Sequence, residues 1–188
     1  MGEQALTLLA INGDSEAFTT LVELSFERTY ALAFRLTQDR DDALDVVQDA
    51  YLRAYRSIGT FRGESAFETW LYRITANSAL AYLGKRKKHR QSEEDEARQN
   101  TKHRVPANIY ESGVLDSDRL AKALKELSPN LRAVIVLRDI YDLSHESVAK
   151  EIGISQSAAK VRLHRARRAL REILERETLA KGELAEGR

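Results

Sequence analysis

Apolar residues recur every three or four positions along most of this chain, the spacing that places them on one face of an α-helix. In the first half of the chain, the pattern predicts helices over 15–36, 41–57 and 66–83. Asp14 or Ser15 is the expected N-cap of the first helix, and Gly84 is expected to end the third. The break before the third helix contains Gly59 and Gly63.

The second half of the chain shows the same helical spacing. It predicts a helix that starts near Asp116 and further helices over 129–141, 144–152 and 155–176. The run Ala133–Leu137 (AVIVL) is β-prone by itself, but Ser128 and Pro129 are a typical helix start and charged residues flank the run. We therefore expect a buried helix there, and an all-α protein.

A polar stretch separates the two helical parts. Residues 89–113 are rich in charge, poor in periodic apolar residues and contain Pro106, a composition typical of a flexible linker. We therefore expect two small helical domains joined by a tether. The expected division is a first domain 1–88, a linker 89–113, a second domain 114–178 and a tail 179–188.

The second domain ends in two predicted helices joined by a tight turn. Ser144 and Ser155 are the expected N-caps, and Gly153 can take the positive φ that the turn requires. Ala149 is small where the two helices would cross. This is the layout of a helix-turn-helix, whose second helix enters the major groove of DNA.

The second of these helices has an apolar and a basic side. At about 100° per residue, the apolar stripe contains Ala159, Leu163, Ala166, Leu170, Ile173 and Leu174. What we call the basic face consists of Ser157, Lys160, Val161, His164, Arg165 and Arg168, with Arg167 and Arg171 beside it. A basic face alone can be an ordinary solvated surface, but together with the caps and the turn it indicates DNA binding.

Charge is segregated along the chain, although the formal net charge is only +1. Residues 39–49 hold five Asp and one Arg, and residues 85–90 hold five Lys or Arg. Residues 160–171 hold six Lys or Arg and no acid. This separation indicates two unlike partners, DNA for the basic parts and a basic protein surface for the acidic part.

The acidic part lies on the helix predicted over 41–57, opposite its apolar stripe. We call Asp45, Gln48, Asp49 and Leu52 the acidic face. A leucine surrounded by polar groups can anchor a protein contact, but single exposed apolar residues are also common on protein surfaces. The residues alone leave both interpretations open.

A third surface spans the glycine-containing break and the helix after it. We call Arg62, Ser65, Trp70, Arg73 and Asn77 the loop–helix surface. Unpaired bases stack on aromatic rings, accept hydrogen bonds from Arg, and can accept them from Asn or donate them to it, so this composition fits single-stranded nucleic acid. Phe67 is expected in the core, and Trp70 fits a core position or a base-stacking role equally well.

Together these segments resemble a bacterial RNA polymerase sigma factor of the extracytoplasmic-function (ECF) group of the sigma-70 family. DALDVVQDAYLRAYRSI (42–58) resembles conserved region 2.2, and FRGESAFETWLYRITAN (61–77) resembles region 2.3 running into 2.4. Residues 143–174 resemble region 4.2. Three motifs in the family's order make a specific combination, and the likeness covers nearly all of the expected folded chain.

The resemblance implies a role for each surface. The acidic face would dock on the clamp helices of the polymerase β′ subunit, the loop–helix surface would capture unpaired bases of the −10 promoter element, and the basic face would read the −35 element as duplex. The β flap of the polymerase and an anti-sigma protein are further expected partners, without membrane insertion. The expected location is the cytoplasm, at the nucleoid when polymerase is bound.

One segment departs from the family pattern. Residues 155–163 read SQSAAKVRL, with Ala159 where the family usually has a valine and Val161 where it has a small polar residue. The −35 preference of this chain therefore does not follow from the resemblance. Val161 offers an apolar contact to a thymine methyl group.

The expected function is a transcription initiation factor that binds core polymerase, recognises the −35 and −10 elements and helps to melt promoter DNA. The alternative is a stand-alone helix-turn-helix regulator that acts without polymerase. We expect neither an enzyme nor a bound cofactor or metal, because the four His are dispersed and no nucleophile motif or phosphate-binding glycine loop is present. The chain has no Cys, and we expect no signal peptide or bilayer-spanning segment.

Overall fold

The computed structural model describes residues 2–93 and 118–186, and every regular element in these residues is a helix. This confirms the all-α expectation. The chain divides into two compact units, Met1–Tyr110 and Glu111–Arg188. The finer domain boundaries expected from the sequence stay predictions.

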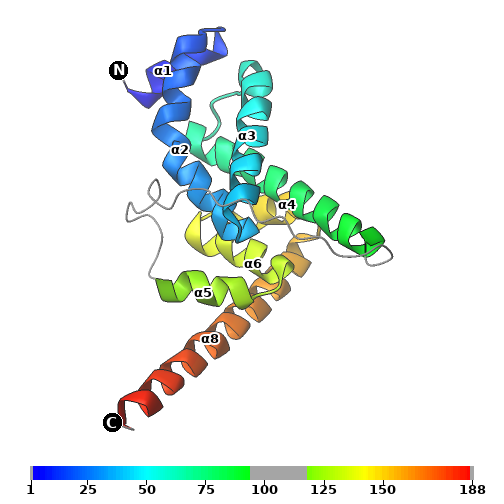
Figure 1. Ribbon diagram of the computed structural model, residues 1–188. Coiled ribbons are helices and arrows are strands. Elements are labelled where there is room, and N and C mark those ends of the chain that lie inside the picture. Colours follow the sequence, from blue (N-terminus) through cyan, green and yellow to red (C-terminus); the bar gives the residue numbers. More distant parts are fainter. Residues whose placement is uncertain (1, 94–117, 187–188) are drawn as a thin grey trace. The chain divides into compact units, whose positions relative to one another are not determined.

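The first unit is a bundle of packed helices. Its described elements are α1 (Glu3–Ile11), α2 (Ser15–Thr37), α3 (Arg40–Ser57), the 3-10 helix η1 (Ile58–Thr60) and α4 (Phe67–Glu93). The helices α2, α3 and α4 pack against one another, and α1 lies against α2 (Figure 1). Asp14 is the N-cap of α2, because its Oδ1 accepts hydrogen bonds from the backbone N–H groups of Glu16 and Ala17 at 3.0 Å. Asp39 caps α3 in the same way.

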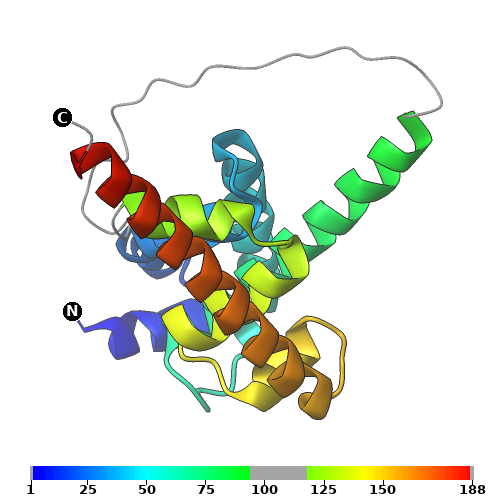
Figure 2. The same ribbon diagram turned by 90° about the horizontal axis from the view of Figure 1, so that it is seen from below.

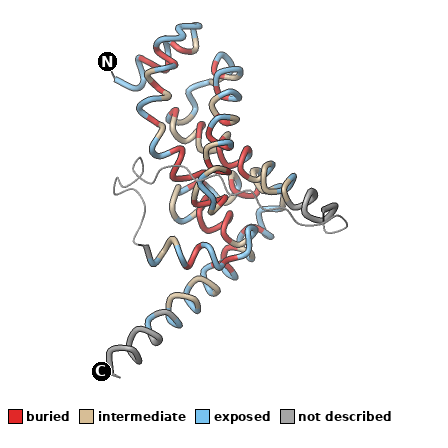
Figure 3. The backbone as a smooth tube through the Cα atoms, viewed as in Figure 1, coloured by how far each residue is buried: buried red, intermediate tan, exposed pale blue. Residues whose placement is uncertain are grey.

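The core of this unit forms where the inward faces of the helices meet (Figure 3). Its large, fully buried side chains include Leu21, Leu32, Leu36, Val46 and Leu71. The sequence pattern does not predict α1, because apolar residues run almost continuously over 5–11 and leave no polar face. Leu6 and Ala10 of α1 nevertheless bury in the same core cluster as Phe18.

The helix α4 continues past its predicted end. We expected Gly84 to terminate it, and that prediction is wrong, because α4 runs on to Glu93. A glycine inside a helix costs only about 1 kcal/mol relative to alanine, and the Lys and Arg residues that follow are good helix formers. Residues 89–93 of the predicted linker are therefore helical, and 94–113 lie outside the described residues.

The second unit is also helical throughout its described part. Its elements are α5 (Asp118–Glu126), α6 (Pro129–Ile135), the π-helical turn η3 (Val136–Ile140), α7 (His145–Glu151) and α8 (Gln156–Glu186). The helix predicted over 129–141 ends as a π-helix, in which the N–H of Tyr141 donates to the carbonyl of Val136 at 3.1 Å. The β-prone run Ala133–Leu137 is helical and buried, as expected.

The predicted helix-turn-helix is formed by α7 and α8. Ser144 Oγ accepts a hydrogen bond from the N–H of Ser147 at 3.0 Å, and Ser155 Oγ accepts one from the N–H of Ala158 at 3.2 Å. Gly153 has a φ of +67°, as the turn requires. α8 continues beyond its predicted end at residue 176 as one unbroken helix (Figure 2).

Candidate functional site

The basic face lies on the exposed side of α8. Behind it, Ala159, Leu163 and Ala166 are 1%, 3% and 0% exposed. Ala149 is also buried, on α7, which packs against α8. All members of the basic face are exposed, namely Ser157, Lys160, Val161, His164, Arg165 and Arg168. The two sides predicted from the helical spacing are therefore confirmed. Leu170, Ile173 and Leu174 continue the stripe but are only half-buried.

Two neighbouring arginines of α8 pair with carboxylates in different places. Arg167 donates two hydrogen bonds to the Asp139 carboxylate, from Nε at 2.8 Å and from Nη2 at 2.6 Å. These hydrogen bonds raise the pKa of Arg167 and tie α8 to η3. Arg168 instead pairs within α8 with Glu172 at 2.9 Å, and both side chains are well exposed. Such an exposed pair contributes little to stability and can be exchanged for another anion.

The acidic face lies along α3, as predicted. Asp45 and Gln48 are exposed, and Leu52 is 51% exposed. Asp49 forms an ion pair with Arg53 at 2.8 Å. Burial raises the pKa of Asp49, but hydrogen bonds and positive charge from its neighbours, including Arg53, outweigh this effect and hold the pKa below its ordinary value. Asp49 is therefore a carboxylate at neutral pH.

An apolar groove opens beside the acidic face, between α2 and α3. Its volume is about 490 Å³, and it is lined by Phe18, Val22, Phe26, Leu44, Val47, Gln48, Tyr51, Leu52 and Tyr55. Leu52 and Gln48 thus belong both to the groove and to the acidic face. The sequence analysis missed the groove, since the pattern on α3 does not reveal which side chains of α2 lie opposite. In the sequence, the local signal for the groove is Tyr55, an aromatic residue three positions after Leu52. In the structure, Tyr55 is 56% exposed.

Tyr51, which lines this groove, makes a polar contact between the helices α3 and α2. The hydroxyl of Tyr51 lies 3.0 Å from Ser25 Oγ and donates to Thr29 Oγ1 at 3.2 Å. Burial raises the pKa of Tyr51, so the phenol stays neutral. This contact fixes α3 on α2 and with it the position of Leu52.

The loop–helix surface begins in the loop before α4. There the side chain of Arg62 is 84% exposed and Ser65 is half-buried. Trp70 is half-buried, with its ring centroid 5.0 Å from that of Phe61 and 5.7 Å from that of Phe67. Phe67 is 3% exposed, which confirms its expected place in the core. Trp70 therefore combines a core contact with a partly exposed ring.

The remaining members of this surface lie on α4. Arg73 is half-buried and Asn77 is exposed. They follow Trp70 by three and seven residues, which places all three on one side of the helix. An ion pair between Arg28 of α2 and Glu68 ties the start of α4 to α2. The structure thus brings Trp70, Arg73 and Asn77 together along one side of α4.

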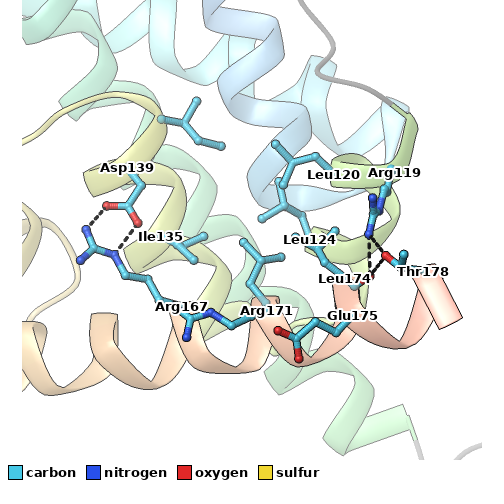
Figure 4. A pocket seen from close by; sticks show the side chains of 12 residues that line it. Arg119, Leu120, Leu124, Ile135, Asp139, Arg167, Arg171, Leu174, Glu175 and Thr178 are labelled. Carbon is cyan, nitrogen blue, oxygen red and sulfur yellow. Dashed lines mark hydrogen bonds and ion pairs between the residues drawn. The ribbon is translucent and has the colours of Figure 1, made fainter.

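A second apolar groove lies in the second unit, among α5, α6, η3 and α8 (Figure 4). Its volume is about 510 Å³, and its apolar lining consists of Leu120, Leu124, Ile135, Ile140, Leu170 and Leu174. Charged side chains also line it, namely Arg119, Asp139, Arg167, Arg171 and Glu175. Arg119 donates to the carbonyl of Leu174 at 2.6 Å and to Thr178, which holds α5 against α8. The sequence analysis did not identify this groove. The signal for it in the sequence is that the apolar stripe of α8 continues to Leu170 and Leu174, and the structure leaves both leucines half-buried.

Among the helices of residues 2–93 and 118–186, none has both the length and the apolar character that crossing a bilayer requires.

Two family models match the chain. Sigma-70 region 2 matches residues 21–89, and Sigma-70, region 4 matches residues 117–170. The first match contains the acidic face and the loop–helix surface. The second contains the helix-turn-helix and the basic face.

Comparison with known proteins gives relatives that match most of this chain. The chain is 35% identical to the ECF RNA polymerase sigma factor SigE of Mycolicibacterium smegmatis, over 86% of this chain and 64% of that protein. It is 33% identical to the ECF RNA polymerase sigma-E factor of Haemophilus influenzae, over 88% of this chain and 91% of that protein. The chain thus spans just under two thirds of the first relative and most of the second.

Solved structures show the same fold. One is the sigma factor RpoE in a co-crystal structure with the anti-sigma factor NepR from Bartonella quintana, with a TM-score of 0.63 and 30% identity. That similarity covers 84% of this chain and 96% of the other. Another is CnrH in complex with the cytosolic domain of CnrY, with a TM-score of 0.59 and 25% identity over 92% and 97% of the two chains.

Proposed function

The chain belongs to the sigma-70 family of RNA polymerase sigma factors, in its ECF group, and from this premise we propose which of its surfaces makes each contact of transcription initiation. Sigma factors are non-enzymatic transcription factors, and this one serves transcription initiation. The observation that carries the proposal is the pairing, in one chain, of an exposed basic helix-turn-helix face with an acidic face that borders an apolar groove. A stand-alone regulator needs only the first of these.

The acidic face is the proposed docking site for core polymerase, on the clamp helices of its β′ subunit. Asp45 and Asp49 supply negative charge for a basic partner, and Gln48 supplies a hydrogen-bonding side chain. Leu52 is part of a larger apolar surface, because it lines the groove between α2 and α3. Protein interfaces combine such an apolar centre with a polar rim. This combination favours docking over the alternative of a solvated helix face.

The loop–helix surface is the proposed site for unpaired bases of the −10 element. Extruding a base from the duplex costs a few kcal/mol, and stacking on an aromatic ring returns about 1–3 kcal/mol per base. The partly exposed ring of Trp70 supplies such a stacking surface, and Arg73 and Asn77 beside it offer hydrogen bonds. Arg62 and Ser65 of the loop add further polar contacts. The strands can thus be held apart without nucleotide hydrolysis.

The basic face is the proposed reader of the −35 element as duplex DNA. The first turns of a recognition helix reach base edges in the major groove, and side chains further along contact phosphates. We assign these contacts to Ser157, Lys160, Val161, His164, Arg165 and Arg168. Arg167 is not among them, because Asp139 holds its guanidinium.

Two further partners complete the proposal. The second unit would contact the β flap of the polymerase, for which its apolar groove offers a surface. An anti-sigma protein would hold the chain inactive, as suggested by the similar structures solved in complex with NepR and with the cytosolic domain of CnrY. The protein would act in the cytoplasm, at the nucleoid while it is bound to polymerase.

The test is transcription in vitro with sigma-free core polymerase and a library of promoters. We expect the purified chain to confer initiation at defined start sites, and scrambling either the −35 or the −10 element should abolish it. A stand-alone regulator would instead bind its duplex tightly without core polymerase and would confer no start site. That second result would remove the proposed function.

A further inference from the structure

One exposed apolar side chain lies in the middle of the basic face. Val161 is 53% exposed. The other large apolar side chains with high exposure in the described residues all belong to the first unit: Leu8, Leu9, Leu24, Leu52 and Tyr55. In the described part of the second unit, Val161 is therefore the one large apolar residue that solvent reaches freely.

Its position on α8 is opposite the core. Val161 lies two residues after the buried Ala159 and two before the buried Leu163, which is about 200° around the helix from each. Ser157 lies one turn before it, and His164 and Arg165 lie one turn after it. Val161 is thus in the centre of the surface that we assign to the −35 duplex.

Neither helix formation nor folding explains a valine there. Valine is a poorer helix former than alanine, because its branched side chain loses rotamer freedom in a helix. Its exposed area contributes no core burial in this unit. The same stiffness is useful in recognition, since little side-chain entropy remains to be lost on contact.

The chemistry of the surroundings selects the ligand. The neighbouring Lys160 and Arg165 favour a polyanion, and α8 is the second helix of a helix-turn-helix. Among the groups on base edges in the major groove, only the C5 methyl of thymine is apolar. The amino and carbonyl groups of the other base edges would lose water against valine without gaining a hydrogen bond.

We infer that Val161 recognises one thymine of the −35 element through its methyl group. This inference rests on the proposed role of the basic face and names the base that this residue selects. It predicts a preference for thymine at one position of the element. It also predicts that the preference depends on the methyl group rather than on base pairing.

The experiment uses polymerase reconstituted from core enzyme and the full chain, with promoters selected from a library randomised over the −35 element. In a selected promoter, each thymine of the element is replaced in turn by deoxyuridine, which lacks only the methyl group. We expect one replacement to weaken promoter binding roughly fourfold, the effect of losing one buried methyl group. In V161A that replacement should have no further effect.

A neighbouring variant provides the matched control. Q156A changes an exposed residue of α8 that is not a member of the basic face, and it should keep the full penalty for deoxyuridine. Selection of promoters with no thymine in the element, or an equal penalty in V161A and the wild type, would overturn the inference. If the selected promoters show no preferred −35 sequence at all, the proposed role of the basic face is removed instead. The two failures are therefore distinguishable.

Discussion

At the scale of single residues, arginine has two different roles in the second unit, one in the core and one on the surface. Arg132 is 6% exposed and donates hydrogen bonds to the carbonyls of Leu124 at 2.8 Å, Leu127 at 2.9 Å and Lys125 at 3.2 Å. The last carbonyls of a helix have no partner within it, so Arg132 caps the C-terminal end of α5. Burial lowers the pKa of Arg132. This arginine stabilises the fold, whereas Arg165 on the exposed side of α8 faces solvent.

Replacing Arg132 tests this structural role. R132M keeps much of the volume but removes the guanidinium that donates to the carbonyls of Leu124, Lys125 and Leu127. We expect a loss of about 1–3 kcal/mol in the stability of the second unit, the cost of a buried polar group left unpaired. Amide hydrogen exchange of α5 and α6 measures it. The exposed K125M on the same helix is the control, and unchanged protection in R132M would contradict the role.

A second pair of arginines separates DNA recognition from folding. R165A should weaken −35 duplex recognition by about 1–3 kcal/mol and leave stability unchanged, because Arg165 is exposed. R167A should lower stability, because Asp139 loses both hydrogen bonds. Holoenzyme binding to intact and −35-scrambled promoters, combined with thermal unfolding, measures both effects. A loss of stability in R165A together with a loss of −35 recognition in R167A would contradict both assignments.

The residues of the proposed sites were predictable to different degrees. The basic face follows from helical spacing alone, because α8 buries one side and exposes the other. The roles of Arg132 and Arg167 do not, since their partners Leu124 and Asp139 lie on other elements. The sequence could not decide whether Trp70 is a core residue or a base-stacking residue, and the structure gives the reason. Its ring packs on Phe61 and is still partly exposed.

At the scale of elements, two glycines show why one helix ends at a glycine and another does not. Gly153 has a φ of +67°, a conformation strained for any residue with a Cβ. Gly84 lies inside α4, and a Cβ added there would meet nothing within 4 Å. The first glycine is therefore required by the turn, and the second only weakens its helix.

Alanine at these two positions should change stability in opposite directions. G153A should destabilise the helix-turn-helix by about 1–2 kcal/mol, and G84A should stabilise the first unit by about 0.5–1 kcal/mol. Trp70, the single Trp of the chain, reports urea unfolding of the first unit by fluorescence. Hydrogen exchange of α7 reports the second. A destabilising G84A would mean that α4 is broken at this point.

The same reasoning explains which elements the sequence pattern predicts. Helix starts are marked locally, so the caps Asp14, Ser144 and Ser155 all follow from the sequence. Ends depend on the sum of weak preferences, which is why α4 and α8 both run beyond their predicted limits. The first helix, α1, escapes prediction because its burial is decided by contact with α2 rather than by its own pattern.

At the scale of the whole molecule, a net charge of +1 conceals two surfaces of opposite sign. The acidic face belongs to the first unit and the basic face to the second. Binding to DNA phosphates depends on local positive charge and weakens with salt. Docking on a basic protein surface depends on local negative charge. One chain thus carries a face for each kind of partner, each on a unit of its own.

Reversing the charge of the acidic face should therefore separate the two activities. The double variant D45R/D49R places two positive charges beside Leu52 and its groove. Like charges brought together across an interface cost several kcal/mol, so we expect affinity for core polymerase to fall by more than about 100-fold. Titration of labelled chain with core polymerase measures this affinity.

The control must match the charge change and differ in its location. E23R/E27R makes the same reversal at two exposed residues of α2 that do not line the groove, and should bind core polymerase normally. Helical content should be unchanged in both variants, because Asp45 is exposed and the Asp49–Arg53 pair is a surface contact. Asp49 also interacts with Ser78 of α4, so urea unfolding of D45R/D49R is compared with that of the wild type to separate a loss of docking from a loss of stability. If D45R/D49R still binds core polymerase as the wild type does, the docking site lies elsewhere on the chain, and the acidic face is a solvated surface.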